Sequence, residues 1–500
     1  MRRILGYINI LTLIPVVLYA YPEGWSDDEL LTPETPGYRL DPDISVDSYK
    51  NVWVVWDSNF WGSGYIYYTK RDSLGNCIIP ETMLPDPMHT SGGYTKVCVD
   101  NSDNVHIQWS EPSTTGKGIG YAKLNNSGAI VVTPHLAMPG YGGGSSCNRH
   151  EIAIDKYKNI NVVWDESPME TNQISYTKLD SLGDTIIARI RVSPIGLYSI
   201  WPGIGADSSA NNHMGYRTDT ATMADRLTYS KLDSNGNILV SNKPLGIGLL
   251  PTIISDRTQN IHMVYLKPTP SRNDVCYLKL DNNGNILVPS KQLSLTQYIH
   301  NNSPHMAMDS LQYLHVVWDM DSAGTFPIMY TKLDTLGNFV IPPMQVVYPP
   351  YTPGGGGARI AVDLSNRLHL VWVDGRVNPG VTTDIFYKRG ENEPGIEEIH
   401  ETTYETTRLI VFPNPFKQAT TIRYLILDSR YLIQHPKIYI YDATGCLVKS
   451  FNPESSQENQ ESEVLWDGRD YADKQRPAGV YFVQLRTKNY TEIKKVIMLE

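Results

Sequence analysis

The sequence predicts an all-β fold in which seven copies of one unit form a β-propeller, and three observations support this prediction. An aspartate followed by the same short apolar pattern recurs seven times from Asp47 to Asp363. The mean period of about 53 residues is long enough for one four-stranded propeller blade. Every copy also carries an aromatic residue nine positions after its aspartate. The 500 residues include 32 Tyr, 10 Trp, 38 Gly and 33 Pro, a composition typical of short strands joined by turns.

The first strand of each unit is predicted to end at the aspartate, as in residues 44–46 and 360–362. A turn follows, because Asx side chains bond to nearby backbone groups and reverse the chain. The aspartates are Asp47, Asp100, Asp155, Asp207, Asp256, Asp309 and Asp363. The residues at plus four are Asn51, Asn104, Asn159, Asn211, Asn260, Tyr313 and Arg367.

The second strand ends at the aromatic residue, and the third strand carries a Tyr-x-Lys or Tyr-x-Arg pattern. The aromatic residues are Trp56, Trp109, Trp164, Tyr216, Tyr265, Trp318 and Trp372. The stems of lysines such as Lys70 and Lys178 are expected to reach water. A hairpin such as residues 72–76, with Gly75 at positive φ, then leads into the outer strand in six copies.

The seventh copy stops after Arg389, before its hairpin and outer strand. An unclosed ring would leave an unpaired strand edge, so residues near 27–33 are predicted to supply the missing strand. The propeller is therefore expected to span residues 21–390. An acidic segment, residues 391–408, is predicted to be a linker.

Residues 409–500 contain strands and turns of a small β-sandwich. Five short segments carry a resemblance to the type IX secretion C-terminal sorting domains: 412–416, 441–445, 466–469, 477–481 and 494–497. The motif residues are Pro413, Asn414, Pro415, Asp467, Gly468, Gly479, Lys494 and Lys495. The resemblance implies an immunoglobulin-like fold, type IX secretion machinery as a partner, and delivery to the surface or outside of a Gram-negative bacterium.

The repeat itself resembles the sialidase-like, BNR-type seven-bladed propellers, in copies such as residues 366–374 followed by 384–387. Such propellers include hydrolases, lectins and scaffolds, so the resemblance implies a fold rather than an activity. The short Asp-box of sialidases is not recognisable here, and the converging arginines and tyrosine nucleophile of sialidase chemistry cannot be assigned by motif.

The N-terminal segment, the net charge and the cysteines indicate where the protein is sent and which partners and sites are excluded. Residues 1–20 have the basic start and apolar run of a secretory signal peptide. No later segment is long and apolar enough for an integral membrane span. The formal charge of −10 without a basic cluster argues against nucleic acid. Five scattered cysteines indicate neither a disulfide framework nor a zinc site.

Binding is expected on one face of the ring, where the loops from second to third strands and those entering each first strand are longest. We call this the loop face. Its acidic and basic candidates are Asp57, Asp165, Asp319, Asp374, Arg149, Arg217, Arg359 and Arg376, with aromatic residues Phe60, Trp61 and Trp201. The preferred binding candidates are Trp61, Asp165, Trp201, Arg217, Asp319 and Arg376.

The leading functional interpretation is an exported module that binds a glycan or a surface protein through the loop face. A glycoside hydrolase of sialidase-like architecture is one alternative, because two carboxylates at suitable separation suffice for hydrolysis. A structural surface protein is the other. No cofactor or metal is expected: histidines at plus six in five copies lie on different blades, which keeps them from converging on one ion.

Overall fold

The computed structural model describes residues 24–32, 38–60, 63–85, 93–113, 116–140, 149–167, 171–220, 223–295, 300–321, 326–347, 356–377, 382–391, 407–412, 414–426, 437–442, 447–451, 461–471, 473–486 and 491–499. The chain divides into two compact units, residues 1–395 and 396–500. Every regular element in the described residues is a strand. The all-β prediction is therefore confirmed.

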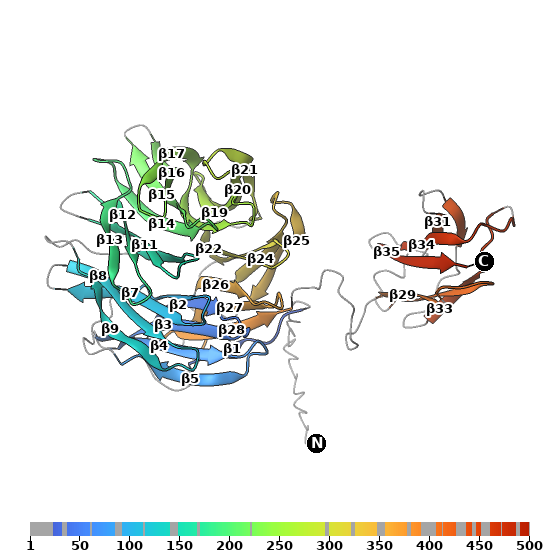
Figure 1. Cartoon of the computed structure of the whole chain (residues 1–500), viewed down its shortest axis with the longest axis horizontal. Coiled ribbons are helices and arrows are strands. Elements are labelled where there is room, and N and C mark those ends of the chain that lie inside the picture. Colours follow the sequence, from blue (N-terminus) through green and yellow to red (C-terminus); the bar gives the residue numbers. More distant parts are fainter. Residues whose placement is uncertain are drawn as a thin grey trace, which may run out of the picture. The chain divides into compact units, whose positions relative to one another are not determined.

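The first unit contains seven four-stranded antiparallel blades. Figure 1 shows them fanned around a common centre in chain order. The first blade contains β2 (Tyr38–Val46), β3 (Val52–Phe60), β4 (Ser63–Arg71) and β5 (Cys77–Met83). The second contains β6 (Lys96–Val99), β7 (Val105–Ser113), β8 (Gly116–Leu124) and β9 (Ile130–Met138). The third contains β10 (His150–Ile154), β11 (Ile160–Glu166), β12 (Gln173–Leu179) and β13 (Thr185–Arg191).

The fourth blade contains β14 (Ser199–Ala206), β15 (Asn212–Thr220), β16 (Met223–Leu232) and β17 (Ile238–Ile247). The fifth contains β18 (Leu249–Ser255), β19 (Ile261–Pro268), β20 (Asn273–Leu280) and β21 (Ile286–Gln292). The sixth contains β22 (His300–Met308), β23 (Leu314–Asp321), β24 (Ile328–Leu333) and β25 (Phe339–Val347). A single parallel pair, Asn273 with His300, links the fifth blade to the sixth.

The seventh blade combines both ends of the first unit. Its inner strands are β26 (Gly356–Val362), β27 (Leu368–Asp374) and β28 (Asp384–Gly390), and its outer strand is β1 (Glu29–Leu30). Glu29 is paired with Tyr387 in antiparallel register. Backbone bonds from Ser26 and Leu31 to β28 extend the pairing on both sides. The edge of β28 is thus covered by the beginning of the chain.

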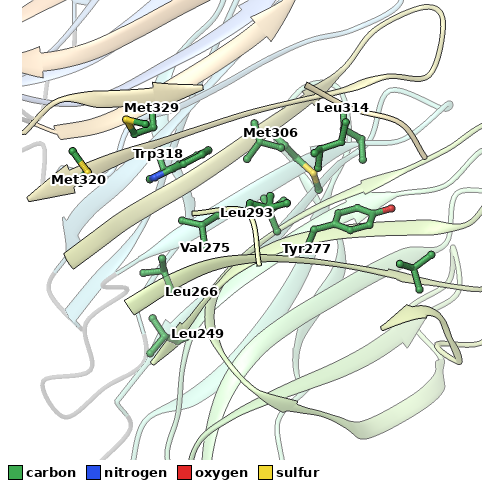
Figure 2. Packing of buried hydrophobic residues seen from close by; sticks show 14 residues of the cluster. Leu249, Leu266, Val275, Tyr277, Leu293, Met306, Leu314, Trp318, Met320 and Met329 are labelled. Atoms are coloured by element: carbon green, nitrogen blue, oxygen red, sulfur yellow. The ribbon is translucent and has the colours of Figure 1, made fainter. Parts of the chain in front are cut away.

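Apolar packing closes the ring. Seven buried clusters each span two neighbouring blades, and one of them joins the seventh blade to the first through residues such as Val371 and Val54. Figure 2 shows the cluster between the fifth and sixth blades, where Val275 and Tyr277 lie opposite Met306 and Trp318. Because every blade buries both faces against neighbours, the seven sheets form one closed stack. The seven-bladed prediction is confirmed.

Each repeat aspartate organises its turn. Asp207, for example, accepts hydrogen bonds at Oδ1 from the backbone amides of Ser209 and Asn211, at 2.8 and 2.9 Å. The residue at plus three has positive φ in all seven turns: Lys50, Asp103, Lys158, Ala210, Gln259, Gln312 and Asn366. The hairpin glycines, including Gly75, also have positive φ, as expected from the sequence.

The third-strand lysines do not extend into water, which corrects the expectation from sequence. Lys70 and Lys178 are 3% and 2% exposed. Lys70 donates to the backbone oxygen of Asn126 at 2.7 Å, and Lys178 donates to that of Ser234 at 3.0 Å. Both acceptors lie in the outer hairpin of the next blade, which covers the end of the lysine strand. A single repeat does not reveal this cover, because it comes from the neighbouring copy.

The second unit is a two-sheet sandwich. One sheet contains β29 (Thr407–Phe412), β30 (Thr420–Ile426) and β33 (Glu461–Trp466). The other contains β31 (Lys437–Asp442), β32 (Leu447–Phe451), β34 (Gly479–Arg486) and β35 (Thr491–Met498). Trp466 is fully buried in the core between them, beside Phe416 and Tyr481. This arrangement confirms the immunoglobulin-like prediction.

Candidate functional site

The innermost strand of the blades is interrupted by a recurring bulge. Register shifts fall between Leu40 and Asp43 and at equivalent points in the fourth to seventh blades. Six residues before each repeat aspartate, six copies have a left-handed residue: Asp41, Tyr94, Trp201, Leu250, Ser303 and Gly357. For residues other than glycine, such backbone conformations cost energy and concentrate at functional sites.

Beside this bulge, each inner strand contributes one residue to a ring around the axis. These residues occupy the position four before each repeat aspartate, which we call the channel position: Asp43, Lys96, Glu151, Gly203, Thr252, His305 and Arg359. Some of these side chains accept hydrogen bonds from backbone amides of the inner strand of the next blade. Asp43 accepts from the amide of Val97 at 2.9 Å, and His305 Nδ1 accepts from that of Ile360 at 3.3 Å. An inner edge without these partners would leave polar groups unpaired.

Charge is distributed unevenly around this ring. From the seventh blade to the third the channel position alternates in sign, through Arg359, Asp43, Lys96 and Glu151. Lys96 lies 2.9 Å from Glu151, and Arg359 lies 4.0 Å from Asp43. The fourth and fifth blades carry the uncharged Gly203 and Thr252 at the same position. The axis therefore has one charged side and one neutral side.

The ionisation states of the ring follow from burial and pairing. Burial would raise the pKa of Glu151, but Lys96 and Arg359 outweigh it and bring the pKa to about 2. Burial, reinforced by the charge of Arg359, lowers the pKa of His305 to about 3. Burial raises the pKa of Asp43 despite the nearby Lys96. At neutral pH, Glu151 is an anion and His305 is a neutral imidazole.

The ring opens into a small pocket of about 40 Å³, which we call the axial pocket. Its lining includes the charged side chains of Arg149, Glu151 and Arg359 and the neutral imidazole of His305. The remaining lining residues are Pro202, Leu250, Pro251, Thr252, Ser303 and Pro304. The lining comes from the inner strands of five blades. This volume accommodates one small group of a ligand rather than a whole ligand.

Two predicted carboxylates lie beside the pocket and bond to backbone. Asp165 accepts from the amides of Arg149 and Trp201, both at 3.1 Å. Asp319 accepts from the amide of Gly357 at 3.2 Å. Burial raises the pKa of both groups, and that of Asp319 reaches about 6. Each carboxylate therefore bonds to the amide of the left-handed residue in the bulge of the following blade, Trp201 for Asp165 and Gly357 for Asp319.

Two other predicted residues meet at the fourth blade. The guanidinium carbon of Arg217 lies 5.2 Å from the ring centroid of Trp201. Arg217 also pairs with Asp219 at 2.8 Å and Asp225 at 2.9 Å. Through the bond of Asp165 to the Trp201 amide, the structure brings Asp165, Trp201 and Arg217 together.

Arg376 occupies a different environment. It pairs with Asp28 at 2.7 Å and with Asp374 at 2.5 Å, and its guanidinium carbon is 4.5 Å from the ring centroid of Phe386. These partners belong to the closure of the seventh blade, and the pocket lining does not include Arg376. Trp61 lies outside the described residues.

Sequence reasoning missed Lys96, Glu151 and His305. Their position in the repeat could have indicated them. The channel position, four residues before the repeat aspartate, differs in chemistry from copy to copy, whereas the next position is mostly apolar.

The plus-six histidines stabilise the blades and do not form a site. In each of the five copies, Nε2 lies 3.2 to 3.3 Å from the repeat aspartate and Nδ1 lies 2.7 to 2.9 Å from a tyrosine hydroxyl. The described residues contain no group of three or more side chains suited to a metal ion.

The sorting-motif residues shape one edge of the second unit. The Asn414 side chain donates to the Lys495 carbonyl at 2.8 Å and accepts from the Ile497 amide at 2.9 Å, which ties it to β35. Pro415 follows Asn414 at the surface, and Gly468 has positive φ after Asp467. Gly479 begins β34, and Lys494 and Lys495 are exposed on β35. Pro413 lies outside the described residues.

Comparison with known proteins gives a family for the second unit. Residues 410–499 match the family described as secretion system C-terminal sorting domain. The chain therefore carries a type IX sorting domain, which marks it for export to the surface or outside of a Gram-negative bacterium. No curated protein matches the chain. The part of the chain that the structure describes contains no helix that is long and apolar enough to cross a membrane.

Three of the solved structures that match the chain share little sequence identity with it. A protein of unknown function from Dyadobacter fermentans is 8% identical with a TM-score of 0.47, and the match covers 74% of this chain and 99% of that one. A polysaccharide lyase is 9% identical with a TM-score of 0.44, over 75% and 94% of the two chains. An α-L-arabinanase from Penicillium chrysogenum is 11% identical with a TM-score of 0.42, over 72% and 94%.

Proposed function

We propose that this exported propeller binds a glycan or a surface protein through its loop face, with one polar group of the ligand entering the axial pocket. The supporting observation is the asymmetric ring of channel positions. Arg149, Glu151 and Arg359 provide ionic and hydrogen-bonding partners on one side of the pocket. Proline and leucine side chains provide an apolar wall on the other. Ligand sites commonly combine an apolar wall with a few converging polar groups.

Binding is favoured over catalysis because the predicted carboxylates are already engaged. Both Asp165 and Asp319 accept from backbone amides that hold the bulge. A nucleophile or general base needs a lone pair directed at the substrate. Trp201 and Arg217 form a planar surface beside Asp165, and such surfaces suit sugar rings and protein side chains.

The test is a glycan array and a surface-protein pull-down with the secreted chain. Arg149→Ala removes a guanidinium from the axial pocket and is expected to weaken binding about tenfold or more. Arg257→Ala is the matched control, because Arg257 lies in the turn between β18 and β19 at the opposite face of the ring and binds Ser310 there. Equal affinity of Arg149→Ala and the parent would refute a role for the axial pocket.

A glycoside hydrolase is the second candidate, and the pKa of Asp319 favours it. A buried carboxyl group with a pKa of about 6 holds its proton well above the usual range and can act as a general acid. Turnover of chromogenic glycosides that Asp319→Asn abolishes would support this candidate. The absence of both ligand binding and turnover would leave the structural role as the remaining proposal.

A further inference from the structure

A second pocket lies on the opposite face of the ring, which carries the repeat-aspartate turns and the outer hairpins. We call this the turn face. The pocket has a volume of about 400 Å³ and lies between the third and fourth blades. Its lining includes Tyr157, Asn159, Lys178, Ile186, Ser234 and Asn235. The volume is within the range of small-molecule sites.

The repeat explains why the pocket opens at this junction. In the second blade, the hairpin between β8 and β9 begins at Asn125, and the residue after it is Asn126. Its amide group donates to Asp47 at 2.8 Å and accepts from Lys70 at 2.7 Å, so it fills the space beside the turn of the first blade. In the fifth blade, Asn282 occupies the same place and donates to Asp207 at 3.1 Å.

The fourth blade has Ser234 at that position. Its side chain is too short to span the gap beside Asp155 and Lys178, which pair at 2.8 Å. The third blade also contributes an aromatic ring, because Tyr157 stands two residues after its repeat aspartate. In the sequence, tyrosine stands two residues after the repeat aspartate in the first and third blades. The hairpin of the following blade supplies Asn126 at the first of these junctions and Ser234 at the second.

The chemistry of the lining indicates the class of ligand. Tyr157 is 63% exposed and Ile186 is 51% exposed, so both offer apolar surface to the pocket. Asn159, Ser234 and Asn235 supply amide and hydroxyl groups. The charge of Lys178 is balanced by Asp155. A neutral sugar ring has the matching features, namely an apolar face for an aromatic ring and hydroxyl groups for amides.

We propose that the pocket between the third and fourth blades binds a neutral saccharide, with the Tyr157 ring as its platform. This site is independent of the axial pocket and lies on the other face of the ring. It would allow one exported chain to hold a sugar on the turn face while the loop face engages a different ligand.

The experiment measures binding of cellohexaose, mannohexaose and xylohexaose to the full secreted chain by saturation-transfer NMR and calorimetry. Tyr157→Ala is expected to weaken binding of the recognised sugar about tenfold or more, because it removes the aromatic platform. Tyr49→Ala is the matched control: Tyr49 has the equivalent place in the first blade and is 70% exposed, but Asn126 fills its junction.

Ser234→Asn is an independent variant. The fold already has asparagine at the equivalent position in two blades, as Asn126 and Asn282. The new amide is expected to bond to Asp155 and Lys178, as Asn126 bonds to Asp47 and Lys70, and so to fill the pocket while the melting temperature is kept. Loss of sugar binding in Ser234→Asn and Tyr157→Ala, with binding kept in Tyr49→Ala, is the expected result. No binding of the three sugars by the parent chain, or unchanged binding in Ser234→Asn, would overturn the proposal.

Discussion

At the scale of single residues, the repeat aspartate bonds to several groups of its unit at once. Asp256 accepts from the amides of Thr258 and Asn260, lies 3.2 Å from His262 Nε2, and pairs with Lys279 at 3.2 Å. Charge-assisted hydrogen bonds of this kind are roughly twice as strong as neutral ones. The recurring aspartate therefore reflects folding rather than ligand binding.

Asp256→Ala should lower the free energy of unfolding by about 2–4 kcal/mol, because a buried histidine and a buried lysine lose their partner. Asp281→Ala is the comparison, since Asp281 bonds to its own hairpin at the surface and a smaller loss is expected there. Urea denaturation followed by tryptophan fluorescence measures both. Similar losses in the two variants would contradict the central role of the repeat aspartate.

Buried histidines predict how stability depends on pH. Burial lowers the pKa of His106 and His262 to about 4, from an unfolded value of about 6.5. A lowered folded pKa means that the unfolded chain binds more protons between these values, so stability is present above pH 6.5 and is lost as pH falls. Each of the two should contribute a loss of about 2 kcal/mol between pH 8 and pH 5.

The urea midpoint should therefore fall steadily below pH 6.5. His262→Asn should reduce that slope, and the third blade shows that asparagine is accepted at plus six, where Asn161 bonds to the Tyr176 hydroxyl. A midpoint that does not change between pH 8 and pH 5 would contradict the neutral state of these histidines.

At the scale of elements, the closure of the ring depends on a short strand. β1 has two residues, and charged side chains around it supplement its few backbone bonds. Asp28 pairs with Lys388 at 2.8 Å and with Arg376 at 2.7 Å. Lys388 is fully buried, so its charge depends on this partner.

Asp28→Asn should destabilise the ring by about 3–5 kcal/mol, because breaking a buried pair leaves an uncompensated charge. Glu29→Gln is the matched control. Glu29 pairs with Arg71 but its side chain is 42% exposed, and exposed pairs contribute little. Hydrogen exchange of β28 measures the effect locally, and equal protection in both variants would argue against closure by Asp28.

The elements also show where sequence reasoning succeeds. The repeat aspartate, the plus-nine aromatic residue and the hairpin glycine are local signals, and each predicted that a strand or turn is present. The predicted end of the second strand was wrong, because this strand continues two to four residues past the aromatic residue in every blade. Lys70 was misjudged because the hairpin that covers it belongs to the next blade. Glu151 and His305 were missed for the same reason: their convergence depends on five inner strands meeting at the axis, which no single copy encodes.

At the scale of the whole molecule, the chain combines a ring with a separate sorting domain. We propose that residues 1–20 are removed during export and that the predicted linker, residues 391–408, connects the two units and ends at β29, which begins at Thr407. The secreted protein should then begin at Tyr21, which intact-mass measurement and N-terminal sequencing can check. A secreted product that retains residues 1–20 would show that this segment stays as an anchor.

Deletion of residues 409–500 should leave the ring folded and abolish its passage across the outer membrane. The seven clusters that close the ring are formed by described residues of the first unit, so we expect the ring to fold without the sorting domain. The truncated chain should accumulate in the periplasm in a protease-resistant form. A chain with residues 397–405 replaced by a Gly-Ser segment of equal length is the control, because it keeps the sorting domain and should be exported. Surface delivery of the truncated chain would refute the sorting role, whereas a protease-sensitive periplasmic product would show that the ring needs the second unit to fold.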